Sequence, residues 1–357
     1  MRDLNRFQGC LVGGAVGDAL GYGIEFTKEP ELFGTWGPEG LRAYKLVDGV
    51  APISDDTQMT LFTGAGLLTD RALGREDPIF SINEAYLDWY RTQRAAFSPA
   101  HTGHSWLMNV PALYAARLPG TTCLGALGAG GMGTPEQPIN DSKGCGGVMR
   151  VAPIGLYRGD TGTDFAYIDR LGAGAAALTH GHPLGWLSAA MLVDMIHCVA
   201  QEDASLPEAV AHAIATVPPL YPRAEQDAAY QSELLEQAVT LAAGTQKPLD
   251  AIHALGEGWV GEEALAIGVY CALRCPDSFE DAVILSVNHR GDSDSTGAVL
   301  GNLLGAKLGL QGIPERFLRD LELKDVILTL AQDLWQGGNP EDPVFRAKYA
   351  DATWAPA

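Results

Sequence analysis

Apolar residues recur every three to four positions along most of the chain, which is the spacing of one face of an α-helix. The segments with this spacing are 5–20, 57–69, 80–92, 104–117, 164–178, 184–200, 206–215, 226–243, 261–274, 278–287, 295–309 and 321–335. Strict alternation of apolar and polar residues, which is typical of half-buried strands, is nearly absent. The pattern therefore predicts an all-α fold.

Long segments rich in glycine, proline and polar residues separate some of these helices, at 22–53, 118–147 and 216–225. Loops of this length in a compact domain usually carry function. None has the composition of a flexible linker, so we expect one compact domain over residues 1–350. The final stretch, 351–357, is expected to form a loose tail.

Two segments place glycine at every fourth position. The first has glycine at 9, 13, 17 and 21, with Asp18 inside the run, and the second has glycine at 297, 301, 305 and 309. This spacing puts the glycines on one helix face, where another helix backbone can approach closely. Each glycine costs about 0.5–1 kcal/mol of helix stability relative to alanine. We expect the two segments to form adjacent central helices that recover this cost by packing.

Acidic residues are concentrated in "SDDT" at 54–57 and "DSDS" at 292–295. Asp55 and Asp56 precede or begin an apolar-periodic helix, where the helix dipole tolerates carboxylates and Ser54 can cap the first turn. Residues two apart on a helix point to opposite sides, so Asp292 and Asp294 can share a ligand only in an extended stretch. We therefore expect both in the loop before the helix at 295–309.

Each acidic cluster alone can be read as an ordinary acidic helix start, but together they suggest a metal site. Four carboxylates flanked by the hydroxyls of Ser54, Thr57, Ser295 and Thr296 offer hard oxygen ligands of the kind that suit Mg²⁺ or Mn²⁺. A pair of such ions about 3.5–4 Å apart would neutralise the carboxylates.

Two further motifs carry candidate chemistry. "KGCGGVMR" at 143–150 is a glycine loop whose backbone N–H groups could hold a phosphate, although it lacks the lysine and hydroxyl ending of a P-loop. "THGHP" at 179–183 contains His180 and His182, and such histidines are more often caps or buried side chains than catalysts.

Charge and cysteine content narrow the functional classes. The formal net charge is -20, from 44 acidic and 24 basic residues, and it repels nucleic-acid phosphates and anionic membranes. The six cysteines show no zinc-ligand or CxxC spacing, which indicates reduced thiols and a cytoplasmic location. The N-terminus lacks a signal-peptide cleavage site, and no uncharged run of about 20 residues predicts a membrane span. The sequence leaves the oligomeric state open, a monomer included.

With these residues in view, the chain resembles the ADP-ribosylglycohydrolases of the dinitrogenase-reductase-activating glycohydrolase type. The motifs that carry the resemblance occur in family order over nearly the whole length. They are "GCLVGGAVGDALGYGIE" (9–25), "SDDTQMT" (54–60), "GCGGVMRVAPIGL" (144–156), "LTH" (178–180) and "NHRGDSDSTGAVLGNLLGA" (288–306). Cys145 stands where the family often has asparagine.

The resemblance implies an all-α enzyme with two divalent cations, Mg²⁺ or Mn²⁺, that hydrolyses the bond between ADP-ribose and a modified protein side chain. It implies that Ser54, Asp55 and Asp56 hold one ion, that Asp292 and Ser295 hold the other, and that Asp294 bridges them. Glu25, or a metal-bound partner such as Asp55, would activate water. The residues implied to bind pyrophosphate and ribose are Gly144, Cys145, Gly146, Gly147, Val148, Met149 and His180.

Two other functions remain compatible with the sequence. An ADP-ribose-binding protein, or an immunity protein against an ADP-ribosyltransferase toxin, would need the pocket without turnover. Another di-metal hydrolase, such as a phosphodiesterase, would need the acidic clusters alone. The linkage could be to arginine, serine or a nucleic-acid base, and arginine is the expectation for a bacterial-type relative.

Overall fold

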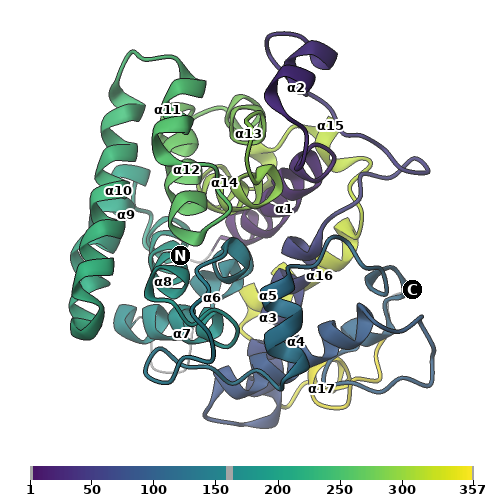
Figure 1. Ribbon diagram of the computed structural model, residues 1–357. Coiled ribbons are helices and arrows are strands. Elements are labelled where there is room, and N and C mark those ends of the chain that lie inside the picture. Colours follow the sequence, from purple (N-terminus) through teal and green to yellow (C-terminus); the bar gives the residue numbers. More distant parts are fainter. Residues whose placement is uncertain (1–2, 158–163, 356–357) are drawn as a thin grey trace.

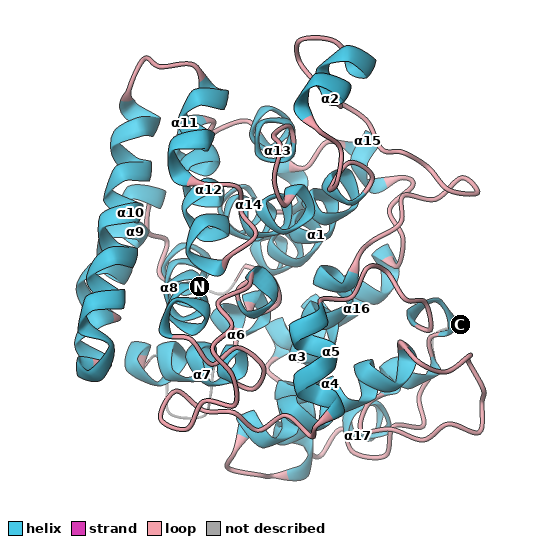
Figure 2. Ribbon diagram, in the orientation of Figure 1, coloured by secondary structure: helices cyan, strands magenta, loops and turns pink. Residues whose placement is uncertain are grey.

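The computed structural model describes residues 3–157 and 164–355. Within these ranges the chain forms α-helices, short 3₁₀ turns and isolated β-bridges, with no β-strand (Figure 2). The α-helices are α1 (Leu4–Tyr22), α2 (Glu29–Trp36), α3 (Asp55–Leu73), α4 (Pro78–Thr92), α5 (Thr121–Gly128), α6 (Ala152–Leu156), α7 (Phe165–Ala177), α8 (Pro183–Gln201), α9 (Leu206–Thr216), α10 (Glu225–Ala243), α11 (Pro248–Leu255), α12 (Gly261–Arg274), α13 (Phe279–Val287), α14 (Ser293–Leu308), α15 (Glu315–Leu318), α16 (Lys324–Gln336) and α17 (Pro343–Tyr349). The 3₁₀ turns are η1 (Trp106–Asn109), η2 (Pro111–Leu113), η3 (Cys145–Gly147), η4 (Pro218–Leu220), η5 (Pro222–Ala224) and η6 (Leu310–Gly312). The predicted all-α fold is confirmed.

The two glycine-rich helices, α1 and α14, pack against each other through their backbones near the middle of the molecule (Figure 1). Gly13 faces Gly301 and Gly17 faces Gly297, so closely that a Cβ at any of the four would overlap the partner's carbonyl oxygen. The expected adjacency of these helices is confirmed. Because the pairs run in opposite directions along the chain, the C-terminal end of α1 lies beside the acidic N-terminal end of α14.

A buried aspartate connects this helix pair to α3. Asp18 lies on α1 and is fully buried, and its carboxylate accepts hydrogen bonds from the backbone N–H groups of Ser54 and Thr57 at the start of α3. Ser54 caps that helix, because its Oγ accepts from the N–H of Asp56 at 3.1 Å. The contacts bring the start of α3 to the place where α1 ends and α14 begins.

The most apolar of the 19-residue helices, α8, lies in the core. Helices α7, α9, α10, α12 and α14 all pack against it. By length and composition it is the one helix among the described residues that could cross a membrane, but it is almost wholly buried inside the protein. Its apolar character is accounted for by this burial.

The segment 104–117 differs from its predicted helix and forms only η1 and η2. Val110 is extended, with φ -100° and ψ 103°, and is followed by Pro111. A residue before proline is sterically disfavoured in the helical region, which explains the break. The expected loops at 22–53 and 118–147 contain the short helices α2 and α5.

Residues 351–355, the described part of the expected tail, contact the rest of the protein through two side chains. The Trp354 ring packs edge-on against the Trp106 ring at a centroid distance of 4.7 Å. The Asn109 amide nitrogen also donates to the carbonyl oxygens of Ala352, at 3.0 Å, and Trp354, at 2.8 Å. Aromatic burial therefore holds the chain to this point, while residues 356 and 357 lie outside the described range.

Candidate active site

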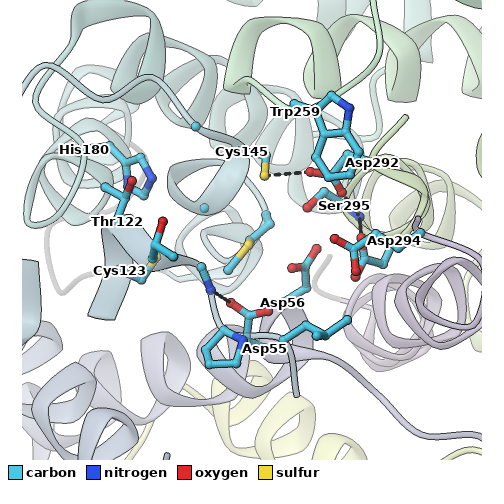
Figure 3. A pocket seen from close by; sticks show the side chains of 18 of the residues that line it. Asp55, Asp56, Thr122, Cys123, Cys145, His180, Trp259, Asp292, Asp294 and Ser295 are labelled. Atoms are coloured by element: carbon cyan, nitrogen blue, oxygen red, sulfur yellow. Dashed lines mark hydrogen bonds between the residues drawn. The ribbon is translucent and has the colours of Figure 1, made fainter. Parts of the chain in front are cut away.

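A pocket of about 580 Å³ opens where the ends of α1, α3 and α14 meet, a size typical of small-molecule sites. Its lining brings together eleven of the predicted site residues (Figure 3). They are Glu25, Asp55, Asp56, Gly144, Cys145, Gly146, Met149, His180, Asp292, Asp294 and Ser295.

The start of α14 gathers two of the carboxylates around one backbone amide. Asp292 is the N-cap, with non-helical backbone, and its Oδ1 accepts from the Ser295 N–H at 3.2 Å. Asp294 Oδ1 accepts from the same N–H at 3.0 Å. The expectation that both aspartates precede the helix is wrong for Asp294, which lies in its first turn. They still converge, because the Asp292 side chain folds back over that turn. Glu25, Asp292 and Asp294 each place a carboxylate oxygen within 4.8 Å of the others.

The start of α3 supplies the opposing carboxylates. Asp55 Oδ2 accepts from the Gly120 N–H at 3.1 Å, so this side chain also positions the loop before α5. Asp56 follows it in the first turn and lines the same pocket. Ser54 is fully buried and does not line the pocket, but its side chain lies close enough to Asp294 to lower the pKa of that carboxyl, against the larger effect of burial. The hydroxyl thus lies between the two acidic helix starts.

Asp55, Asp56, Asp292 and Asp294 together form the acidic wall of the pocket. Burial and mutual repulsion dominate its electrostatics. Burial raises the pKa of Asp55, Asp56 and Asp292 well above the ordinary range, and the charge of Asp294 raises each further. The same causes raise the pKa of Glu25 to about 9. Carboxylates this close cannot all ionise unless protons or cations compensate them.

The donor set fits divalent cations with oxygen ligands. Asp56 Oδ2 and Glu25 Oε2 are buried and have no hydrogen-bond partner in the described part of the chain. A buried carboxylate oxygen without a partner is destabilising, and a bound cation would compensate it. Oxygen atoms of carboxylates and serine hydroxyls are ligands that Mg²⁺ and Mn²⁺ prefer.

The glycine loop forms another wall of the pocket and is tied to the start of α12. Gly144 pairs with Val260 in an isolated bridge, and the Cys145 N–H donates to the Trp259 carbonyl at 3.2 Å. The Gly144 N–H donates to Ser142 Oγ at 3.4 Å. Two of the amides predicted to hold phosphate are therefore already engaged. The Cys145 thiol donates instead to Asp292 Oδ2 at 2.8 Å, which links the loop to the acidic wall.

Not every residue of the predicted glycine motif faces the pocket. Gly147 and Val148 are absent from its lining, and both are buried. A Cβ at Gly147 would lie 2.7 Å from the Gly185 carbonyl oxygen, so this glycine allows close packing on α8. Met149 does line the pocket.

His180 lines the pocket as a buried neutral imidazole. Burial, and then the Arg150 guanidinium, lower its pKa to about 3. Its Nδ1 is 2.8 Å from Thr179 Oγ1, which also accepts from Arg150 at 2.7 Å. A Cβ at Gly146 would lie 2.9 Å from the His180 ring, so the glycine lets the ring pack against the loop. His180 can bind substrate through a neutral ring nitrogen but carries no charge at neutral pH.

The sequence motifs did not identify an aromatic pair at the pocket. Phe26 and Trp259 both line it, and their rings stack at a centroid distance of 5.7 Å with 19° between the planes. Phe26 is 68% exposed and Trp259 is 37% exposed. Their separation along the chain leaves no local pattern that could have predicted the pair. Asp18 was likewise visible only as a charge within a glycine run.

Comparison with known proteins decides the family. A sequence model of the ADP-ribosylglycohydrolase family matches residues 1–343. The chain belongs to the ADP-ribosylglycohydrolase family. It is therefore a glycohydrolase enzyme that acts on ADP-ribosylated targets, and divalent-metal dependence is a property of that family.

Several relatives of this ADP-ribosylglycohydrolase match over nearly its whole length. Human ADP-ribosylhydrolase ARH3 is 25% identical over 93% of each chain. The ADP-ribosyl-[dinitrogen reductase] glycohydrolase of Rhodospirillum rubrum is 24% identical over 90% of this chain and 91% of its own. The ADP-ribosylarginine hydrolase Tri1 of Serratia proteamaculans (strain 568) is 24% identical over 95% of this chain and 81% of its own.

A solved structure described as an ADP-ribosylglycohydrolase-related protein complex shares the fold. It superimposes with a TM-score of 0.64 at 25% identity, covering 94% of this chain and 99% of its own. The predicted resemblance and the predicted fold are both confirmed.

Proposed function

We propose that this enzyme removes ADP-ribose from arginine side chains with two divalent cations, Mg²⁺ or Mn²⁺, bound by the acidic wall. The observation that carries the proposal is the meeting of Asp55 and Asp56 with Asp292 and Asp294 across one pocket. Support for the arginine linkage comes from the similarity to a hydrolase named for ADP-ribosylarginine. The acidic pocket also favours a cationic guanidinium as the modified group.

The cation ligands would be Ser54, Asp55 and Asp56 on α3 and Asp292, Asp294 and Ser295 on α14. When bound, such ions would polarise ribose hydroxyls and stabilise charge as the glycosidic bond breaks. Asp294 suits a bridging role, because it lies within reach of Ser54 on one helix and Asp292 on the other. Ser54 would contribute through its hydroxyl or by orienting Asp294.

The remaining pocket residues would have two roles, activation of water and binding of substrate. Glu25 or Asp55 would take the proton of the attacking water, since both carboxylates line the pocket. His180 and the loop from Gly144 to Gly146 would bind ribose and pyrophosphate. Met149 would add apolar contact at the same wall.

Product analysis tests the proposal directly. The enzyme is incubated with Mg²⁺ and separate arginine-, serine- and DNA-linked ADP-ribose substrates, and the products are separated by chromatography. We expect free ADP-ribose, released fastest from the arginine-linked substrate. AMP as the product would indicate pyrophosphate cleavage by a phosphodiesterase. Tight ADP-ribose binding without turnover on any substrate would indicate a binding or immunity protein.

A further inference from the structure

A second cluster of metal-binding side chains lies outside the pocket, where α8 and α9 meet. Asp194 and Cys198 are one turn apart on α8, and His212 faces them from α9. One ligand atom from each lies within 4.8 Å of the other two. His212 Nδ1 is 2.9 Å and 3.0 Å from the Asp194 carboxylate oxygens, and Cys198 Sγ is 3.7 Å from Asp194 Oδ1.

A fourth side chain, an acidic one, lies beside this cluster, and its burial is not compensated by a donor. Asp169, on α7, is fully buried, and neither of its carboxylate oxygens accepts a hydrogen bond from an N–H or O–H donor among the described residues. It lies within hydrogen-bonding reach of Asp194, which is itself fully shielded from solvent. Two buried carboxylates in contact need a proton or a cation between them.

From this geometry we propose that Asp169, Asp194, Cys198 and His212 form a binding site for a zinc ion, separate from the pocket. The set combines a thiolate, an imidazole and two carboxylates, and four protein ligands of these types suit structural Zn²⁺. The all-oxygen wall of the pocket suits harder cations instead. The two sites therefore differ in the metal that each selects.

The position of the cluster gives the ion a structural role. Gly185, whose carbonyl borders the glycine loop, and Asp194 are both on α8, about 14 Å apart along the helix axis. Helices α7 and α9 pack on α8 (Figure 1), so the ion would join three helices. The His212 side chain is 35% exposed and provides a route of entry from solvent.

Cobalt(II) provides a spectroscopic test on the whole protein. Saturating Mg²⁺ is added to occupy the acidic wall, and a Cys145→Ser background removes the other described thiol that hydrogen-bonds a carboxylate. We expect one equivalent of Co²⁺ to give a thiolate-to-cobalt charge-transfer band, which one equivalent of Zn²⁺ abolishes. Cys198→Ser should lose the band. Cys275→Ser, a half-buried cysteine outside the cluster, should keep it. No band in the background protein would overturn the proposal.

Asp169→Asn keeps the test decisive if Cys198→Ser fails to fold. Asparagine matches the shape of the buried acid but is a poor cation ligand, so Zn²⁺ affinity by calorimetry should fall by about tenfold or more. Zn²⁺ should raise the melting temperature of the background protein and raise that of Asp169→Asn much less. Equal affinities and equal melting shifts in the two proteins would show that the cluster is a proton-sharing acid pair and not a zinc site.

Discussion

Asp18 Oδ2 accepts two hydrogen bonds from Thr57, one from its N–H at 3.1 Å and one from its hydroxyl at 2.5 Å. The same carboxylate accepts from the Ser54 N–H at 2.9 Å. All of these bonds have Asp18 as the acceptor, so the carboxylate holds the first turn of α3 in place. Asp18 is thus a positioning residue for Asp55 and Asp56, which follow Ser54 directly.

We predict that Asp18→Asn weakens metal binding without removing any metal ligand. Asp18 uses both carboxylate oxygens as acceptors, whereas asparagine has only one acceptor oxygen. The asparagine NH2 group would face the N–H and O–H donors of Ser54 and Thr57. The expected loss is about 1–3 kcal/mol of unfolding free energy, with about tenfold weaker Mg²⁺ binding by calorimetry. Asp70→Asn is the matched control, since Asp70 is a buried aspartate at the other end of α3 that accepts from Ser81. Asp70→Asn should change stability but not Mg²⁺ affinity.

If both variants bound Mg²⁺ like the wild type, Asp18 would have no positioning role.

Gly301→Ala should strongly destabilise the fold. The new Cβ would overlap the Gly13 carbonyl oxygen, and neither backbone can move without separating α1 from α14. We expect a loss of about 1–3 kcal/mol or more in urea unfolding. Gly34→Ala on α2, where a Cβ meets nothing within 4 Å, should instead be neutral or stabilising by about 0.5–1 kcal/mol. Equal effects of the two changes would mean that the glycine contact is not tight.

The four-residue glycine spacing predicted the central helix pair, because glycines on one helix face allow another helix backbone to approach closely. Hydrophobic periodicity predicted the long helices but missed the short ones, which show too few repeats: α2, α5, α6, α11, α15 and α17. Of these, α2, α6, α11 and α17 have proline in the first turn, a signal that could have identified them.

The candidate site was predictable where its chemistry is local and not where it depends on tertiary packing. Both acidic helix starts were found from adjacent residues, but the folded-back Asp292 side chain was not, because helix geometry alone separates it from Asp294. The stack of Phe26 on Trp259 joins distant segments and has no sequence pattern. Val148 was assigned to substrate from its motif, although packing turns it into the core.

Asp169→Asn should change how the stability of the metal-free protein depends on pH. Burial, and then the charge of Asp194, raise the pKa of Asp169 to about 8, while its value in the unfolded chain is about 3.9. Between these values the native state binds the extra proton, so wild-type stability falls as pH rises from about 4 towards about 8. Asparagine does not titrate. We expect the variant to be about 1–3 kcal/mol more stable near pH 8 and to match the wild type near pH 4, in urea unfolding with a chelator present. If the two proteins differed in unfolding free energy by the same amount at both pH values, the raised pKa assigned to Asp169 would be wrong.

Glu25→Gln should separate catalysis from binding. Glu25 lines the pocket, and one of its buried carboxylate oxygens has no hydrogen-bond partner among residues 3–157 and 164–355, as expected for a group that binds water or a ligand. Glutamine keeps its shape but cannot accept a proton from water. We expect turnover to fall by about 10²-fold or more, the range typical of a lost general base, with ADP-ribose affinity by calorimetry within a few-fold. A large loss of affinity at unchanged turnover would instead make Glu25 a binding residue.

Chelation should abolish activity, and Mg²⁺ or Mn²⁺ should restore it. The acidic wall offers carboxylates and hydroxyls, and ions held by such oxygen ligands would be removed readily by EDTA. Turnover of an ADP-ribosylated substrate is measured before chelation, after dialysis against EDTA, and after each ion is returned. Full activity in exhaustively chelated enzyme would mean that the acidic wall works without ions.

Asp294→Ala should be the most damaging change among the acidic residues. After burial, the charge of Asp294 is the largest cause of the raised pKa values of Asp56 and Asp292, and the Ser54 side chain lowers the pKa of Asp294 itself. The loss of Asp294 would remove negative charge from between the two proposed cations, whose repulsion would be strong at a separation of about 3.5–4 Å. At least one ion should leave.

Asp292→Ala is the comparison variant, because it would remove a ligand of one ion and leave the proposed bridging carboxylate in place. It should cost chiefly the ion on the α14 side, with partial recovery of activity at high Mg²⁺ or Mn²⁺, whereas Asp294→Ala should not recover. Both metal-free variants should fold and should melt at or above the wild-type temperature, because fewer buried carboxylates repel one another. Calorimetric metal titration with thermal melts separates loss of an ion from loss of fold. Two ions bound by Asp294→Ala at near wild-type affinity would rule out the bridge and move that role to another carboxylate, with Asp56 the first to test because one of its buried oxygens lacks a partner.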